Sequence, residues 1–166
     1  MTGLQEMIFL SEIVLQSKIA QRAAERLKVS EDNFDNIEIW ASIQSILVAA
    51  ANVSKILWPN KKYEKRGEHL RKLLKVADDS PLADRKFRNH FEHYDDRIEE
   101  WFKSHRSGVY IDLAMNPSLP GRMFNNNHRG YNSFNGTLVF RDESLDLNEV
   151  VKSLETLLEN SKPFVL

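Results

Sequence analysis

Residues 87–102 read FRNHFEHYDDRIEEWF, and the order of apolar and polar side chains in this stretch predicts an α-helix. The apolar residues recur at alternating spacings of four and three, which places them in one stripe at about 100° per residue. The stripe consists of Phe87, Phe91, Tyr94, Ile98, Trp101 and Phe102. Arg88, Asn89 and His93 fall outside it, so we expect the helix to present them away from its core-facing side.

Arginine and histidine on one rigid support suit chemistry on phosphate groups. A guanidinium is permanently charged, and an imidazole titrates near neutral pH. The pattern of Arg, then four to six residues, then His occurs three times, as the pairs Arg85 with His90, Arg88 with His93, and Arg122 with His128. Of the three arginines, Arg88 is the one followed directly by Asn and lying near the start of a long amphipathic helix.

The bulk composition restricts the class of protein. A chain of 166 residues suits a single domain, residues 1–166, with its own core. The absence of cysteine excludes disulfides, thiolate nucleophiles and cysteine zinc sites, as in a reducing cytoplasm. The net charge of −1 gives no global basic field, so any RNA site has to be local.

Membrane insertion and export are not expected. Glu6 and Glu12 interrupt the apolar N-terminal segment, which also lacks a basic leader. The most apolar run, residues 45–53, is too short to span a bilayer. We therefore expect a soluble, cytoplasmic protein without a membrane partner.

Two helices are predicted before Pro59. The first runs from about Leu4 to Lys28, and its periodicity predicts one buried stripe. That stripe consists of Leu4, Ile8, Leu15, Ile19, Ala23 and Leu27. The second helix opens at a capping box of Asp35 and Glu38 and stops at Trp58-Pro59.

Three more helices follow. A short basic helix covers residues 61–76. Ser80, an N-cap followed by proline, opens a fourth helix that continues to about Ser104. Asp146 with Glu149 forms a capping box for a last helix that runs to about Asn160.

Residues 107–142 differ in character from the helices. The segment is rich in glycine and asparagine and contains two short β-like runs, Val109–Ile111 and Thr137–Phe140, which we expect to pair antiparallel. The predicted fold class is therefore all-α. Its architecture would be an up-and-down bundle of four to five helices with a small β-hairpin insertion before the last helix.

In the residues from Arg88 to His93 the chain resembles the HEPN superfamily. That superfamily consists of all-helical bundles whose signature is Arg, four to six residues, then His, commonly with Asn, Asp or His directly after the arginine. The resemblance covers roughly residues 4–104 and the final helix, and leaves out the hairpin. Where some HEPN toxins carry a modified tyrosine two residues after the histidine, this chain has Asp95, and Tyr94 is one position early.

The resemblance implies a metal-independent endoribonuclease of the toxin or phage-defence type, active as a homodimer on RNA. His93 would act as general base or acid, Arg88 would hold the phosphate, and Asn89 would orient either group. Five residues of helix separate Arg88 from His93 by about 140° around the axis and ~7.5 Å along it. A composite site at a two-fold axis would bring Arg and His of different subunits together. An antitoxin or inhibitor protein is a further partner that the resemblance implies.

Simpler interpretations stay open. Arg88 can pair with Glu92, and His93 with Asp96 or Arg97, as on any solvated helix. The protein would then be a non-catalytic HEPN-like module that binds a protein or nucleotide partner, or a plain helical dimerisation domain. His90 borders the apolar stripe and is expected to be a structural histidine.

No metal or other cofactor is expected. His90, His93 and Asp96 fan across about 120° of the helix, which does not converge on one ion. In the glycine-rich segment, Arg122, His128 and Arg129 are candidate RNA-binding residues, although a flexible, solvated loop is the simpler interpretation and the favoured one.

Overall fold

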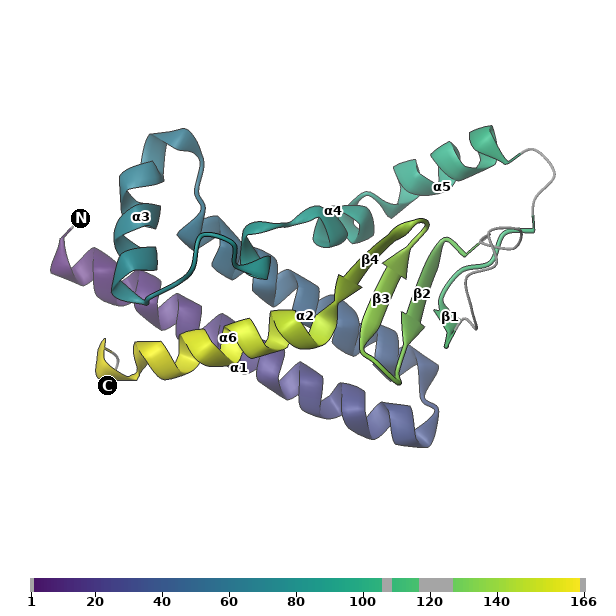
Figure 1. Ribbon diagram of the computed structural model, residues 1–166, viewed down its shortest axis with the longest axis horizontal. Coiled ribbons are helices and arrows are strands. Elements are labelled where there is room, and N and C mark those ends of the chain that lie inside the picture. The colour runs from purple at the N-terminus through teal and green to yellow at the C-terminus, as the bar shows by residue number, and fades with distance from the viewer. Residues whose placement is uncertain (1, 106–108, 117–126, 165–166) are drawn as a thin grey trace. The chain divides into compact units, whose positions relative to one another are not determined.

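A computed structural model describes residues 2–105, 109–116 and 127–164. The chain divides into two compact units (Figure 1). The helical unit comprises residues 1–85 and 149–166, and the mixed unit comprises residues 86–148. The predicted insertion, residues 107–142, lies inside the mixed unit.

The described residues are mainly α-helical, with six α-helices and four strands. The α-helices are α1 (Gly3–Asn33), α2 (Asn36–Leu57), α3 (Glu64–Leu73), α4 (Lys86–Glu92), α5 (Tyr94–Ser104) and α6 (Leu147–Ser161). Three short 3₁₀ turns accompany them at Lys61–Tyr63, Pro81–Ala83 and Lys162–Phe164. The mainly α class is confirmed, whereas the small hairpin is wrong because the strands form a sheet of four.

Helices α1 and α2 form an antiparallel hairpin in the helical unit (Figure 1). Phe34 ends α1 in the left-handed region at φ 56°, and the Asp35 side chain then accepts the Glu38 N–H at 3.1 Å. The predicted N-cap of α2 is therefore confirmed. The Glu38 carboxylate does not complete the capping box, because it accepts from Arg26 Nε at 2.8 Å.

The predicted buried stripe of α1 is largely wrong. Only Ala23 and Leu27 of that stripe are buried, and the buried face is instead Leu10, Ile13, Ser17, Ala20, Ala23, Leu27 and Ser30. The other four predicted residues are exposed, namely Leu4 (68 %), Ile8 (59 %), Leu15 (50 %) and Ile19 (40 %). Four of the seven residues on the buried face are serine or alanine, whose small side chains permit close approach of α1 to α2. A prediction based on the spacing of large apolar residues does not identify such a face.

Helix α2 forms the core of the helical unit. Its buried residues surround most of the helix and include Trp40. Among the described helices it alone is long and apolar enough to cross a bilayer, and 56 % of its most apolar window is buried inside the protein. A core helix of a soluble protein meets the same criterion, so this is weak evidence for a membrane span.

The last helix follows the prediction closely. Helix α6 begins after Asp146, whose side chain accepts the Asn148 N–H at 2.9 Å, and ends at Ser161. Its buried stripe is Leu147, Val150, Leu154 and Leu157, with spacings of three and four. The capping residue Asp146 predicted the start of this element, because a cap depends on the adjacent residues alone.

The predicted single helix from Ser80 to Ser104 is wrong. The Ser80 side chain accepts the Leu82 N–H at 3.4 Å as an N-cap, but the turn that it opens ends at Ala83. Helix α4 then begins at Lys86, and α5 begins after His93. Asp95 and Asp96 favour a new helix start here, because carboxylates stabilise the positive end of the helix dipole.

The interruption changes which aromatic side chains are buried. Phe87 and Trp101 are buried as predicted, whereas Tyr94 and Phe102 are exposed. Phe102 and Tyr110 both pack against the Trp101 ring, with ring centroids 5.0 and 5.1 Å from it.

The mixed unit contains a four-stranded sheet in the order β1-β2-β3-β4 (Figure 1). The strands are β1 (Ala114–Met115), β2 (Arg129–Asn132), β3 (Thr137–Phe140) and β4 (Glu143–Asp146). Strands β1 and β2 are parallel, and the other pairs are antiparallel, with Gly130 opposite Val139 and Leu138 opposite Leu145.

The two predicted strands have different outcomes. Thr137–Phe140 is confirmed as β3, whose Leu138 and Phe140 side chains are buried. Val109–Ile111 is not a strand, and Ile111 makes only an isolated bridge to Asn127. The partners of β3 are β2 and β4, so the predicted pairing of the two runs is wrong.

Candidate functional site

The Arg88 side chain lies on α4 and already has partners in the chain. Its guanidinium donates to the Glu92 carboxylate one turn later and, at 3.3 Å, to Asn89 Oδ1. The Arg88 side chain is 18 % exposed, while Asn89 is exposed. The ion pair with Glu92, one of the interpretations that the sequence left open, is therefore present.

His93 lies at the junction between α4 and α5. Its N–H donates to the Asn89 carbonyl at 3.0 Å, and its carbonyl accepts the Arg97 N–H at 3.1 Å. Its backbone departs from helical geometry, with φ −107° and ψ 38°. The imidazole is exposed and makes no hydrogen bond or ion pair within residues 2–105, 109–116 and 127–164. The expected pairing of His93 with Asp96 or Arg97 is absent there.

The spacing of Arg88 and His93 survives the helix interruption. The bond from the His93 N–H to Asn89 is the ordinary helical i to i−4 bond, so the turn from Arg88 to His93 is intact. The backbone deviates only at His93 itself. The two side chains therefore point in different directions from one turn, as predicted for an uninterrupted helix.

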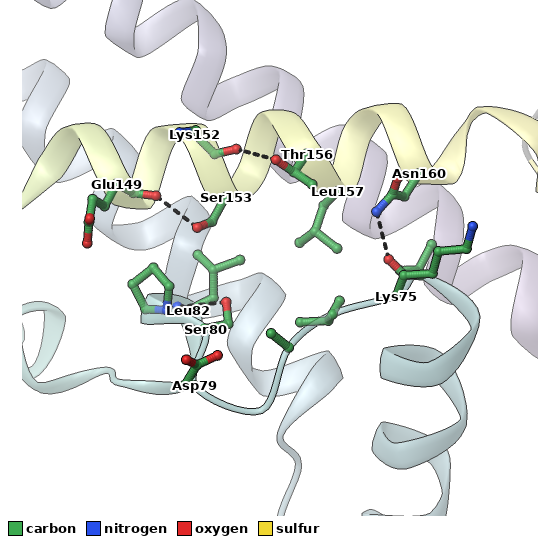
Figure 2. Close-up of a pocket in the computed structure, with 14 residues that line it drawn as sticks. Lys75, Asp79, Ser80, Leu82, Glu149, Lys152, Ser153, Thr156, Leu157 and Asn160 are labelled. Atoms are coloured by element: carbon green, nitrogen blue, oxygen red, sulfur yellow. Dashed lines mark hydrogen bonds between the residues drawn. The ribbon is translucent and has the colours of Figure 1, made fainter.

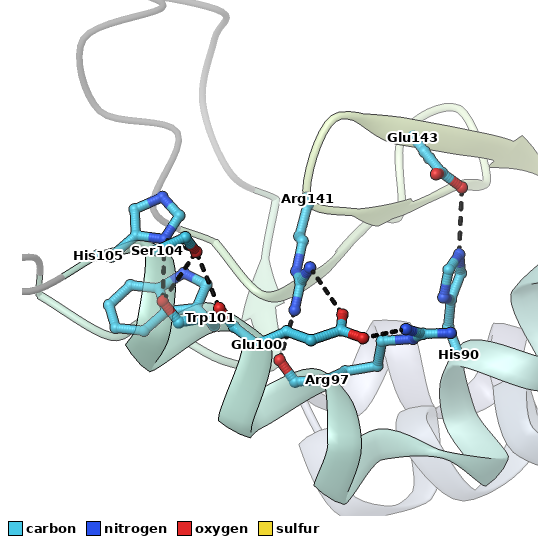
Figure 3. A network of polar contacts seen from close by, with 8 residues as sticks. All are labelled: His90, Arg97, Glu100, Trp101, Ser104, His105, Arg141 and Glu143. Carbon is cyan, nitrogen blue, oxygen red and sulfur yellow. Dashed lines mark hydrogen bonds and ion pairs between the residues drawn. The ribbon is translucent and has the colours of Figure 1, made fainter.

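His90 is the structural histidine that the sequence predicts. Its ring stacks on Phe140 of β3, and its Nε2 lies 3.1 Å from Glu143 Oε2 (Figure 3). Lys86 Nζ lies 2.9 Å from the other Glu143 oxygen. The hydrogen bond from Lys86, and to a lesser extent that with His90, holds the pKa of Glu143 below its ordinary value. These contacts attach α4 to the hairpin of β3 and β4.

The candidate RNA-binding residues are placed differently from the expected solvated loop. Arg122 lies outside the described residues. His128 is fully buried between Tyr110 and Phe140, with ring centroids 5.4 and 4.9 Å away. Burial removes the ring from water and so disfavours its charged, protonated form, which lowers the pKa of His128 to about 4. The solvated-loop interpretation is therefore wrong for His128.

Arg129 is also not a free surface cation. It lies in β2 and forms a two-pronged ion pair with Asp112, with Nε to Oδ1 at 2.9 Å and a second contact at 2.6 Å. Its guanidinium carbon is 5.4 Å from the centre of the Phe91 ring. Burial alone would raise the pKa of Asp112, but hydrogen bonds and charge from Arg129 hold it below its ordinary value.

The sequence did not predict the polar cluster of Arg97, Glu100 and Arg141. Arg97 NH1 donates to Glu100 Oε1 at 2.6 Å, and Arg141 NH1 donates to Glu100 Oε2 at 3.4 Å (Figure 3). The hydrogen bond from Arg97, with the charges of both arginines, lowers the pKa of Glu100. Arg97 and Glu100 are three residues apart on α5, a spacing from which their ion pair could have been predicted. Nothing in the sequence near Arg141 indicates that it contacts Glu100.

A cavity of about 410 Å³ lies in the helical unit, between α6 and the segment 74–82 (Figure 2). The Asn160 side chain crosses one end of it to donate to the Leu74 carbonyl at 2.9 Å. The hydroxyls of Ser153 and Thr156 donate to backbone carbonyls of their own helix. Because these hydroxyl protons are already engaged, the cavity offers fewer donors to a ligand than its composition suggests.

No group of three or more His, Asp or Glu side chains in the described residues is placed to hold a metal ion. Comparisons with protein-family models, with curated proteins and with solved structures found no match to this chain.

Proposed function

We propose that this protein is a HEPN-like, metal-independent endoribonuclease of the toxin or phage-defence type, acting in the cytoplasm. The observation that carries the proposal is the exposed, unpartnered ring of His93 in the described structure, one intact helical turn after Arg88. A general acid or base has to reach the proton that it transfers, and an exposed imidazole is free to do so. Helices α1, α2, α3 and α6 would correspond to the up-and-down bundle of that superfamily.

The proposed roles follow from the chemistry of each side chain. His93 would take the proton of a ribose 2′-hydroxyl or give one to the leaving 5′-oxygen. Arg88 would bind the scissile phosphate and stabilise its growing charge, with Asn89 as an orienting group. The guanidinium of Arg88 now contacts the Glu92 carboxylate through one nitrogen, and a phosphate would offer it a two-pronged contact instead.

The proposed active form is a homodimer with a composite site. Arg88 and His93 leave α4 in different directions, so a single chain does not aim both at one phosphate. A two-fold axis would place Arg88 of one subunit beside His93 of the other.

The exposed stripe on α1 supports dimerisation. Leu4, Ile8, Leu15 and Ile19 lie symmetrically about the midpoint between Ser11 and Glu12. In an antiparallel pair of α1 helices, Leu4 would therefore meet Ile19 of the second copy, and Ile8 would meet Leu15. A two-fold interface requires this kind of self-complementary surface.

Expression in a bacterial host, followed by RNA cleavage assays with purified protein in EDTA, tests the proposal. The wild type should slow growth and cleave RNA, while the His93→Ala and Arg88→Ala proteins should fold, dimerise and lose both effects by at least about 100-fold. His69→Ala is the matched control, because His69 is also exposed but lies in the helical unit beside Glu6. Cleavage that persists in His93→Ala would exclude the proposed chemistry.

A non-catalytic module that binds a second copy or another protein is the second candidate. The engagement of Arg88 by Glu92 and Asn89, together with the apolar stripe on α1, favours it. Leu15→Glu should abolish dimers in analytical ultracentrifugation under both hypotheses, whereas Gln21→Glu, an exposed change elsewhere on α1, should not. Only the enzyme predicts that Leu15→Glu also abolishes RNA cleavage.

A further inference from the structure

Arg97 and Arg141 approach the same carboxylate although they lie far apart in the sequence. Both donate to Glu100, and Arg141 also donates to the backbone carbonyl of Arg97 (Figure 3). Each arginine side chain is 29 % exposed, whereas Glu100 is 48 % exposed. Arg141 is therefore held by a backbone carbonyl as well as by Glu100, and the carboxylate between the two arginines is the more accessible partner.

The two arginines line a cavity of about 280 Å³ in the mixed unit. His90 and Phe140 form part of its wall, and Asp142 and Glu143 complete its lining with Glu100. The Nε atoms of Arg97 and Arg141 and the Nδ1 atom of His90 are buried without a hydrogen-bond partner in the described part of the chain. Buried polar atoms ordinarily have partners, so these three indicate donors and acceptors that a ligand could satisfy.

The contacts of Glu100 set the charge directly beside the arginines. Two guanidinium groups contact this one carboxylate, while the whole lining, with Asp142 and Glu143, holds three carboxylates against two arginines. Glu143 is engaged by Lys86 and His90 on the other side of the cavity. Asp142 is exposed in the turn after Arg141 and is the remaining carboxylate of the lining.

We propose that Arg97 and Arg141 form a binding site for a phosphoryl group, which Glu100 occupies with its carboxylate when no ligand is bound. The planar fork of a guanidinium matches carboxylate and phosphate oxygens with the same geometry. A phosphoryl group can therefore take the place of the Glu100 carboxylate at the guanidinium NH groups. If the arginine side chains adjust, its additional oxygens can also accept from the buried Nε groups that lack partners in the described residues.

Arg97 of this site lies on α5, the helix that begins directly after His93. The Arg97 N–H donates to the His93 carbonyl, so one helical turn separates the two residues. If the proposed ribonuclease is correct, the site would hold a second phosphate of the same RNA strand. Phosphoryl binding itself does not depend on that activity.

Titrations followed by NMR of the arginine Nε–H signals test the site directly. The probes are adenosine 5′-monophosphate, the dinucleoside monophosphate ApA and adenosine, and Arg97→Lys and Arg141→Lys identify the two signals. A phosphomonoester site predicts that the monophosphate shifts both signals, a phosphodiester site predicts that ApA does, and adenosine should shift neither. The site is refuted if neither phosphate probe moves these signals.

Variants distinguish binding at the two arginines from a general effect of the protein's net charge on phosphate affinity. Glu100→Gln should tighten binding roughly fivefold or more, because it removes the internal competitor, while Arg141→Lys should weaken it roughly tenfold. Glu38→Gln is the matched control, since it removes an exposed carboxylate that pairs with Arg26 in the helical unit. Equal tightening by Glu38→Gln and Glu100→Gln would overturn the proposal. The same titration in the His93→Ala protein keeps this result separate from any failure of the ribonuclease hypothesis.

Discussion

The rings of His90 and Phe140 lie parallel, with centroids 4.1 Å apart and an interplanar angle of 5°. His90 belongs to α4 and Phe140 to β3, so this stack joins the segment that carries Arg88 and His93 to the sheet. The contact of Nε2 with Glu143 holds the ring at its edge as well. The orientation of the candidate site is therefore maintained by a residue that does not itself take part in the proposed chemistry.

His90→Ala is expected to lower the free energy of unfolding of the mixed unit by about 2 kcal/mol, through loss of the stack and of the Glu143 contact. Urea unfolding measured by circular dichroism checks this value. His90→Phe keeps the stack and should lose less stability than His90→Ala. An equal loss in both variants would show that the stack contributes little.

Asp112→Asn should be more damaging than removal of a surface carboxylate. Asp112 and Arg129 form a largely buried pair, with side chains 18 % and 13 % exposed. Loss of one partner leaves a buried guanidinium uncompensated, which costs about 3 kcal/mol. Glu38→Gln, at the exposed pair with Arg26, should cost less than about 1 kcal/mol. Comparable unfolding free energies for the two variants would contradict the burial argument.

His128 should make the protein less stable in mild acid. The unfolded chain protonates His128 near pH 6.5, whereas the folded protein resists protonation until pH is about 4. The unfolded state thus binds more protons between these values, so stability falls as pH decreases, by about 2 kcal/mol between pH 7 and pH 5. Urea unfolding across this range should show that slope in the wild type.

His128→Gln provides the control for that slope. The variant lacks the titrating imidazole, so its stability should change less between pH 7 and pH 5 even if it is less stable at both. Asp112 and Glu143 have pKa values below their ordinary range, and their contributions are lost only at lower pH. If the free energy of unfolding falls equally with pH in the wild type and the variant, His128 is not the origin of the pH dependence.

Gly67 marks a close approach of α3 to the end of α2. A Cβ at this position would lie 2.5 Å from the Leu57 carbonyl oxygen and 2.5 Å from Cδ of Pro59. Gly67→Ala should therefore destabilise the helical unit by about 1–3 kcal/mol, as overpacking does. Gly3→Ala is the control, because a Cβ there meets nothing within 4 Å and alanine favours the helix. In thermal unfolding, the midpoint temperature should fall for Gly67→Ala and should rise or stay unchanged for Gly3→Ala.

Local features of the sequence were sufficient to predict several caps, although α1 continues to Asn33, beyond its predicted end near Lys28. Asp35, Ser80 and Asp146 each accept a backbone N–H within three residues, so their caps depend on the neighbouring chain alone. The run Thr137–Phe140 likewise identified its strand from nearby residues. Arg88, Asn89 and His93 also lie within six consecutive residues, so their spacing along the helix could be predicted from the neighbouring chain.

Only the tertiary structure decided which faces and partners these elements use. The sequence suggested Leu4, Ile8, Leu15 and Ile19 as the core face of α1, yet the small residues of the opposite face pack on α2. Arg141 reaches a carbonyl 44 positions away, and His128 is buried among rings from distant segments. Hydrogen bonds within one turn are specified by adjacent residues, whereas apolar burial is non-directional and depends on whatever surface the rest of the chain supplies.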